Sequence, residues 1–171
     1  MMQINGVTYL FTADEGSGRD YEEVRFGDLD NTCINGESLK DDAMLGRLTI
    51  TTSFPAEVSD GVLDCETIHS FGGRSFSMFQ VNSDGIELVF NSMQSDETDI
   101  EYITSITNPS YFNSQDDEPD FDDRSDDKGA EPEALRVGKV GDATLVFVGM
   151  EFALHWWCGY KTSKVTAYMQ M

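Results

Sequence analysis

The sequence predicts an antiparallel all-β protein with one short helix and two long acidic loops. Short runs of alternating apolar and β-branched residues, turn residues between these runs, and a single segment with helical spacing lead to this prediction. The first expected strand covers residues 7–12 and leads directly into an acidic, glycine-containing loop at residues 14–20. Residues 48–52 alternate apolar residues with threonine, which is typical of a half-buried strand.

Two β-hairpins are expected further along the chain. The first covers residues 75–91, where Asn82-Ser83-Asp84-Gly85 separates two apolar runs as a turn. The second joins residues 135–140 to residues 143–150 through the two-residue loop Gly141-Asp142, which is typical of a type II′ turn. Several short strands of this kind are consistent with a sandwich, a barrel or the blades of a propeller, and periodicity does not choose among them.

One segment has helical spacing. Within residues 96–106, the isoleucines Ile100, Ile103 and Ile106 recur at every third position, with acidic residues in the first turn. Ser95 or Asp96 is the expected N-cap. A helix this short is marginal on its own, so we expect tertiary contacts to stabilise it.

The charge of the chain restricts its partners. The 171 residues include 32 acidic and 11 basic side chains, for a formal charge of −21 and an isoelectric point near 4.1. Because there is no basic patch to neutralise phosphates, nucleic acid is excluded as a partner, and an anionic membrane surface would repel the chain. Cations, mineral surfaces or basic proteins are the expected partners. The 39% of apolar residues are sufficient for a hydrophobic core.

The cysteines and the N-terminus bear on the compartment. The three cysteines are Cys33, Cys65 and Cys158. A Cys33–Cys65 bridge is expected if the protein is exported, and free buried thiols are the alternative. The first sixteen residues contain neither a basic nor an apolar region of a signal peptide, and no apolar run approaches the length of a membrane span.

The segment at residues 116–133 is the most acidic part of the chain, with ten carboxylates and two basic side chains. Oxygen-rich clusters of this kind suit Ca²⁺, although the spacing does not match an EF-hand. A solvated, disordered acidic loop is the alternative. Together with the loop at residues 14–20, this segment supplies the candidate metal ligands Asp122, Asp123, Asp126, Asp127, Glu131, Glu133, Glu15 and Asp20.

Other residues that could bind a ligand or take part in catalysis have simpler structural explanations. Arg19, Arg74 and Arg124 could bind an anionic ligand, or they could only neutralise neighbouring acids in ion pairs. Residues 71–76 (FGGRSF) lack the Gly-Lys-Ser/Thr ending of a P-loop, so a tight turn entering a strand is expected there. His69 is the one histidine near the serine of this segment, and we predict no catalytic residue and no zinc site.

Three phrases stand in the chain in a fixed order: FTADEGSGRDYEEVR at residues 11–25, SFGGRSFSMF at 70–79 and YFNSQDDEPDFDDRSDDKGAEPEAL at 111–135. Together they resemble the mesenchyme-specific cell surface glycoproteins of calcifying animals and their bacterial relatives, the choice-of-anchor I proteins. FVGME at residues 147–151 is similar to a further element of this family. The resemblance covers about residues 3 to 151 and identifies the chain as a piece of a longer family member.

The resemblance implies a β-propeller-like protein of the extracellular space or cell surface. We therefore expect residues 1–151 to form a partial propeller and residues 152–171, which contain no acid, to be an atypical tail, truncated or misread. Because the animal members are associated with biomineralising cells, we expect a non-enzymatic calcium-binding protein connected with biomineralisation or a mineral matrix. One alternative is a Ca²⁺-dependent phosphate-ester hydrolase, since some bacterial relatives are described as phosphatase- or phytase-like. A metal-free protein-interaction module is the other.

Overall fold

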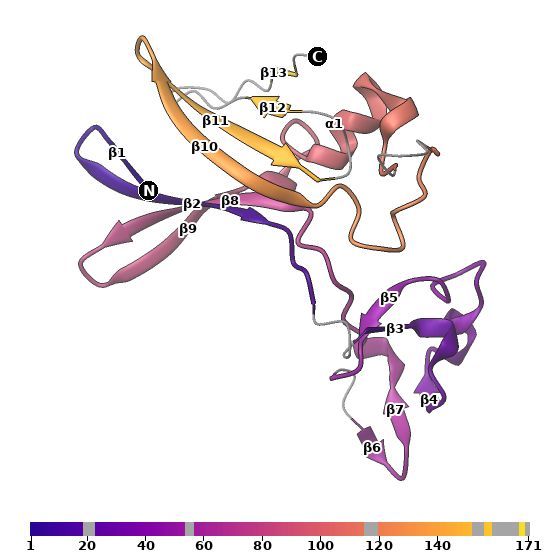
Figure 1. Ribbon diagram of the computed structural model, residues 1–171. Coiled ribbons are helices and arrows are strands. Elements are labelled where there is room, and N and C mark those ends of the chain that lie inside the picture. The colour runs from indigo at the N-terminus through magenta and orange to yellow at the C-terminus, as the bar shows by residue number, and fades with distance from the viewer. Residues whose placement is uncertain (19–22, 54–56, 115–119, 152–155, 159–167, 170–171) are drawn as a thin grey trace. The chain divides into compact units, whose positions relative to one another are not determined.

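The computed structural model describes residues 1–18, 23–53, 57–114, 120–151, 156–158 and 168–169. The described strands form four small open sheets, accompanied by one short α-helix, so the protein is mostly β, as the sequence predicts (Figure 1). The chain divides into two compact units, each with its own hydrophobic core. Unit 1 contains residues 1–15, 73–123 and 129–171, and unit 2 contains residues 16–72 and 124–128.

The first sheet of unit 1 is antiparallel, with the strand order β1-β2-β8-β9. Its strands are β1 (Met2–Ile4), β2 (Val7–Asp14), β8 (Ser75–Asn82) and β9 (Gly85–Asn91). The predicted hairpin at residues 75–91 is confirmed as β8 and β9. Strand β1 was not predicted, although Asn5-Gly6 is a typical hairpin turn and both residues have positive φ angles, 51° and 83°.

The second sheet of unit 1 is also antiparallel, with the order β10-β11-β12-β13. Its strands are β10 (Pro132–Val140), β11 (Ala143–Met150), β12 (Trp156–Cys158) and β13 (Tyr168–Met169). The predicted second hairpin is confirmed, with Val140 opposite Ala143 across the Gly141-Asp142 loop. The division of the chain at residue 151 stays a prediction.

The core of unit 1 joins both of its sheets to the helix. Phe11 and Phe76 from the first sheet, Val148 from the second and Ile100 from the helix belong to one cluster of buried side chains. These residues alternate with residues on the opposite face of each strand, as the period of a β-strand requires. Removal of this apolar surface from water is the main force that holds unit 1 together.

Helix α1 (Ile100–Thr107) begins four residues later than predicted. Its N-cap is Asp99, whose carboxylate accepts a hydrogen bond of 2.9 Å from the Tyr102 amide, so the prediction of Ser95 or Asp96 as the cap was wrong. Ser95 instead accepts a hydrogen bond from the Thr98 amide in the preceding turn. Five short 3₁₀ helices complete the described elements: η2 (Phe26–Asp28), η3 (Glu37–Lys40), η4 (Cys65–Thr67), η5 (Ser92–Gln94) and η6 (Pro109–Tyr111).

Unit 2 contains the other two sheets. Strand β3 (Glu23–Arg25) pairs antiparallel with β5 (Thr49–Thr51), inside the segment predicted as a strand at residues 48–52. The second sheet has the order β4-β7-β6, with strands β4 (Thr32–Asn35), β7 (Val62–Asp64) and β6 (Glu57–Ser59). Strands β4 and β7 are parallel, which is an exception to the predicted antiparallel arrangement. The chain between them is long enough for the crossover that parallel pairing requires.

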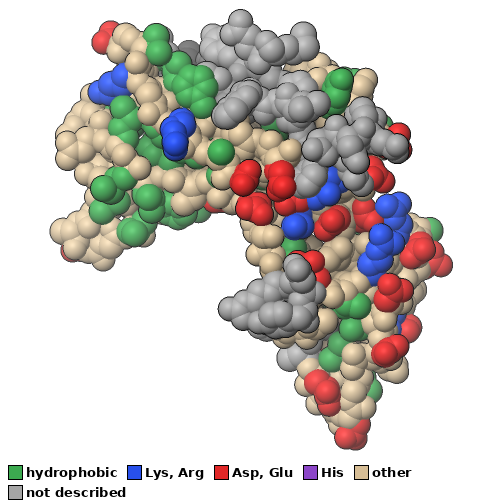
Figure 2. Space-filling view, viewed as in Figure 1, with side chains coloured by type: hydrophobic (Ala, Val, Ile, Leu, Met, Phe, Trp, Pro, Cys, Tyr) green, Lys and Arg blue, Asp and Glu red, His purple; other side chains and the backbone are tan. Residues whose placement is uncertain are grey.

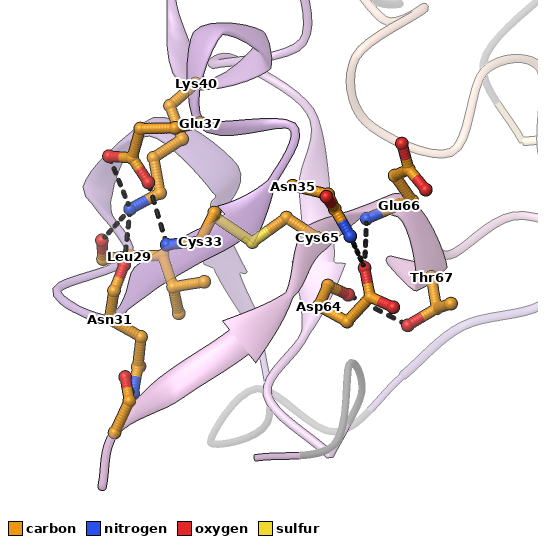
Figure 3. The surroundings of a disulfide bond; sticks show 11 residues. Leu29, Asn31, Cys33, Asn35, Glu37, Lys40, Asp64, Cys65, Glu66 and Thr67 are labelled. Carbon is orange, nitrogen blue, oxygen red and sulfur yellow. Dashed lines mark hydrogen bonds and ion pairs between the residues drawn. A yellow bond between two sulfur atoms is a disulfide. The ribbon is translucent and has the colours of Figure 1, made fainter. Parts of the chain in front are cut away.

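A disulfide bond between Cys33 and Cys65 lies in the core of unit 2 (Figure 3). The two Cα atoms are 5.4 Å apart, and both cysteines are buried. Of the two alternatives that the sequence left open, the structure therefore has the bridge. On a chain-entropy model, a bridge that closes the loop from Cys33 to Cys65 stabilises the fold by about 4 kcal/mol.

Polar groups around the disulfide are bonded to the backbone (Figure 3). The Glu37 carboxylate accepts a hydrogen bond of 2.8 Å from the Cys33 amide. The Lys40 ammonium donates to the carbonyls of Leu29 and Asn31, at 2.9 and 2.6 Å. These bonds satisfy polar groups that would otherwise be buried at a cost.

Within the described residues, no helix has the length and apolar character needed to cross a membrane.

Candidate cation site

Three glutamates of unit 1 converge. One carboxylate oxygen from each of Glu15, Glu131 and Glu151 lies within 4.8 Å of the other two. Glu131 is only 1% exposed, Glu15 is half-buried and Glu151 is exposed. Glu131 and Glu151 flank one hairpin, whereas Glu15 is far from both in the sequence, so the fold of unit 1 brings the three together. We call this group the carboxylate cluster.

The end of strand β2 positions Glu15. The Glu15 carbonyl accepts a hydrogen bond of 3.0 Å from the Gly73 amide, which joins the residue after β2 to the segment that enters β8. Immediately before it, the Asp14 carboxylate accepts hydrogen bonds from the hydroxyls of Ser75 and Ser77, at 2.8 and 2.6 Å. These bonds across the sheet hold the backbone that carries Glu15.

The hydrogen bonds of Asp14 extend to a third strand. The Thr12 hydroxyl donates to the Asp14 carboxylate at 2.6 Å, and the Asn91 amide nitrogen on β9 donates to Ser75 and Ser77, each at 3.0 Å. Strands β2, β8 and β9 are thus joined at one end by side chains as well as by backbone pairing. Ser75 therefore takes part in this structural network of hydrogen bonds.

The pairing of β10 with β11 positions the other two glutamates. Glu131 precedes β10 and Glu151 follows β11, and the Glu151 amide donates a hydrogen bond of 2.9 Å to the Glu131 carbonyl. Because Pro132 lies opposite Met150, the residue before Pro132 and the residue after Met150 lie at the same end of the hairpin. Glu131 also has a positive φ of 46°, a conformation that costs a non-glycine residue on the order of 1 kcal/mol and that often occurs at functional sites.

The composition of the carboxylate cluster suits a hard cation. At an effective dielectric constant near 20, two unit negative charges about 5 Å apart repel by roughly 3 kcal/mol, unless a positive group offsets them. Ca²⁺ binds six to eight oxygen atoms, and carboxylates combine with backbone carbonyls and water in such sites. Three converging carboxylates supply part of this set, whereas zinc would require the nitrogen or sulfur donors that the cluster lacks.

Comparison with known proteins supports the assignment that the three sequence phrases suggested. The model of the choice-of-anchor I domain matches residues 1–165. The chain belongs to the choice-of-anchor I family. Gigasin-3a of Magallana gigas is 34% identical over 119 residues, which are 67% of this chain and 39% of that relative. The chain thus spans about two fifths of the relative's length. No solved structure matches the chain.

Most of the predicted ligands of this choice-of-anchor I chain lie outside the carboxylate cluster. Asp122 and Asp123 are exposed in a turn of unit 1, and Glu133 is exposed on β10. Asp126 and Asp127 belong to unit 2. Of the predicted ligands, Glu15 and Glu131 are in the cluster, and the others stay predictions; Asp20 lies outside the described residues.

Two acids of the predicted set are engaged with arginines in unit 2. The Asp126 carboxylate lies 2.9 Å from the Arg47 guanidinium, and its carbonyl accepts a hydrogen bond from Thr49 on β5. Asp127 lies 3.9 Å from Arg124, whose side chain is buried. These contacts favour the interpretation of Arg124 as a neutralising residue over that of an anion-binding residue.

Glu151 was not among the predicted ligands, although the family phrase FVGME contains it. The sequence carries a signal that would have found it. A two-residue loop at Gly141-Asp142 sets the register of β10 against β11, and this register places residue 151 close to residue 131. Glu15 has no comparable signal, because its approach to the hairpin depends on how the two sheets of unit 1 pack.

The predicted tight turn before β8 is present, and Arg74 takes part in an ion pair. Gly72 has a φ of 90°, and a side chain there would also meet the backbone of Lys128, so only glycine fits this turn. The Arg74 guanidinium contacts Glu101 of helix α1 at 3.1 Å. Arg74 is therefore a neutralising residue in unit 1, whereas Arg19 lies outside the described residues.

Proposed function

We propose that this chain is a calcium-binding part of a non-enzymatic extracellular or cell-surface protein. The convergence of Glu15, Glu131 and Glu151, with oxygens within 4.8 Å of one another and Glu131 almost fully buried, carries the proposal. Hard oxygen donors held by paired strands provide the preorganisation that a Ca²⁺ site needs. The net charge of −21 further favours cations and mineral surfaces as partners.

The proposed location has independent support. The buried Cys33–Cys65 bridge is typical of proteins that fold in an oxidising compartment. The family resemblance adds an association with biomineralising cells and mineral matrices. Secretion of the full protein from cells, with the bridge intact in peptides mapped by mass spectrometry, is the expected result. Retention in the cytosol with both cysteines free would contradict the proposed location.

We also propose that the two sheets of unit 1 are neighbouring blades of a partial β-propeller. Each consists of four antiparallel strands, the usual size of a blade, and the two share one core. A crystal structure tests this arrangement. The proposal requires the sheets to fan out around a common axis, and a closed sandwich of the two sheets would refute it.

Calorimetric titration with Ca²⁺ tests the cation site. We expect saturable binding by the natural chain and an affinity at least about tenfold lower in Glu131→Gln, because that change removes a buried charged ligand. Glu133→Gln is the matched control, since Glu133 lies two residues away but is exposed on β10. Equal Ca²⁺ affinities of the two variants would show that the carboxylate cluster is not the Ca²⁺ site.

The same preparation separates the proposal from the two alternatives. Turnover of para-nitrophenyl phosphate is measured with and without Ca²⁺. Binding without turnover supports the non-enzymatic role, and binding with Ca²⁺-dependent turnover favours a hydrolase whose metal activates water. The absence of both favours a metal-free interaction module.

A further inference from the structure

Strand β9 is an edge strand with exposed apolar side chains. It pairs with β8 on one side, and its other side pairs with no strand in the described part of the chain. Ile86 is 63% exposed and Leu88 is 50% exposed. An unpaired edge presents a row of N–H and C=O groups to which another extended segment can add.

A set of apolar side chains of β2, β8 and β9 shares one face of the sheet. Val81 lies opposite Ile86, and Phe79 lies opposite both Leu88 and Leu10. Because successive residues of a strand point to opposite faces, this face is turned away from the core that contains the intervening residues of β2 and β8. Figure 2 shows hydrophobic side chains gathered on this part of unit 1. We call Leu10, Phe79, Val81, Ile86 and Leu88 the outer face.

The charges on this sheet have one sign. Residues 2–14 and 75–91, which include all four strands and both hairpin turns, contain no lysine or arginine. Their acids are Asp14, Asp84 and Glu87. Proteins commonly protect an exposed edge strand with lysine, and β9 has no such protection.

We propose that the edge of β9 binds an extended cationic polypeptide, which adds to the sheet as a further strand. Its apolar side chains would continue the outer face, and its basic side chains would lie near Asp84 and Glu87. Backbone hydrogen bonds supply affinity in this mode of recognition, and alternate side chains supply specificity. The proposal uses no residue of the carboxylate cluster, so it stands apart from the proposed calcium binding.

A second copy of the chain fits the same edge poorly. Symmetric antiparallel pairing of two β9 strands about Leu88, their central residue, would place the two Glu87 side chains diagonally across the pair on the same face, where their like charges repel. Each copy also carries a formal charge of −21. A cationic segment removes both repulsions, and this is why the charges favour it as the occupant.

Titration with a synthetic peptide tests the proposal. The probe is an acetylated and amidated peptide of about eight residues that alternates lysine with valine, and the buffer contains EDTA so that no cation site contributes. One control peptide replaces lysine with glutamate, and a second keeps lysine but carries N-methyl groups on alternate residues. We expect the probe to bind, with an affinity that falls as salt is raised, and both controls to bind at least about tenfold more weakly.

Variants locate the binding site. Ile86→Thr combined with Leu88→Thr removes apolar contact, and Asp84→Asn combined with Glu87→Gln removes charge; we expect each pair to weaken binding about tenfold. Val140→Thr is the matched control, because Val140 is 65% exposed on the other hairpin, beside Lys139, and should leave binding unchanged. If the variant with Ile86→Thr and Leu88→Thr does not fold, the variant with Asp84→Asn and Glu87→Gln still tests the proposal.

Three outcomes would overturn the proposal. Equal binding of the N-methylated peptide would show that no strand is added, because the backbone donors would be dispensable. Unchanged binding in the charge pair would place the peptide elsewhere. A dimer by analytical ultracentrifugation that Leu88→Lys dissociates would make a second copy the occupant of β9.

Discussion

The Arg74 Nη1 lies 3.1 Å from the Glu101 Oε1, and this ion pair joins the residue before strand β8 to the first turn of helix α1. Both side chains are largely buried. Burial raises the pKa of Glu101 above its ordinary value of 4.5, and the Arg74 guanidinium and a hydrogen bond from Asn113 only partly oppose this effect. The pair therefore joins the helix to the sheet. Because its pKa is raised, the Glu101 carboxyl takes up a proton more readily in the folded chain than in the unfolded chain.

This raised pKa predicts a pH-dependent difference between Glu101→Gln and the natural chain. A carboxyl with a raised pKa contributes stability that is fully present below pH 4.5 and is lost as the pH rises through its folded pKa. Glutamine imitates the protonated form at every pH. The free energy of unfolding of the variant should therefore increase relative to the natural chain between about pH 4 and about pH 7, because only the natural chain must ionise a buried carboxyl over this range. Urea unfolding at both pH values measures it, and exposed Glu97→Gln should show no such trend.

Loss of Arg74 should be costly at neutral pH. Arg74→Met leaves the Glu101 carboxylate buried without its cation, and we expect the free energy of unfolding to fall by about 2 kcal/mol at pH 7, somewhat less than for a fully buried pair. At about pH 4 the loss should be smaller, because the protonated carboxyl needs no counter-charge. A loss that does not vary with pH would mean that Arg74 acts through packing alone.

The bridge between Cys33 and Cys65 should stabilise unit 2 selectively. In Cys33→Ser with Cys65→Ser, we expect the amides of β4 and β7 to lose hydrogen-exchange protection equivalent to about 4 kcal/mol. Amides of β2 and β8, which belong to unit 1, serve as the internal control. Equal loss of protection in both sets would show that the two units unfold as one.

Asp14 should be important for the stability of the first sheet. Asp14→Ala removes the acceptor of three hydroxyl hydrogen bonds, and we expect a loss of about 3 kcal/mol in the free energy of unfolding. Asp84→Ala, in the exposed turn of the neighbouring hairpin, should change it by less than about 0.5 kcal/mol. Thermal unfolding of both variants provides the comparison. Similar losses in the free energy of unfolding would show that the hydrogen bonds of Asp14 do not stabilise the sheet.

Calcium should stabilise the folded chain by mass action. A concentration about one hundred times the dissociation constant adds about 2.7 kcal/mol, which a rise in the melting temperature detects. Glu131→Gln should abolish this rise. The double variant Asp122→Asn with Asp126→Asn distinguishes two ligand sets: the sequence-based set predicts that the rise is lost, whereas a site formed by the carboxylate cluster alone predicts that it is retained.

Local features of the sequence were sufficient for much of the fold. Turn residues between alternating runs predicted both the β8–β9 and the β10–β11 hairpins, because a hairpin depends on residues that are close in sequence. The three phrases identified the choice-of-anchor I family, which the match over residues 1–165 confirms. The helix was predicted in the right place but with a start four residues too early, because several acids could cap it and packing selects Asp99.

The sequence by itself determined the hairpins, the acidic surface and the family of this protein, since each depends on neighbouring residues or on composition. Only the tertiary structure decided that β4 and β7 run parallel beside a disulfide, and that Glu15 meets Glu131 and Glu151. The register of the β10–β11 hairpin marks Glu131 and Glu151 as neighbours, but with 32 acids in the chain no local pattern marks Glu15 as the third. Contacts between segments more than one hundred residues apart depend on how whole sheets pack, and that packing is a property of the entire core.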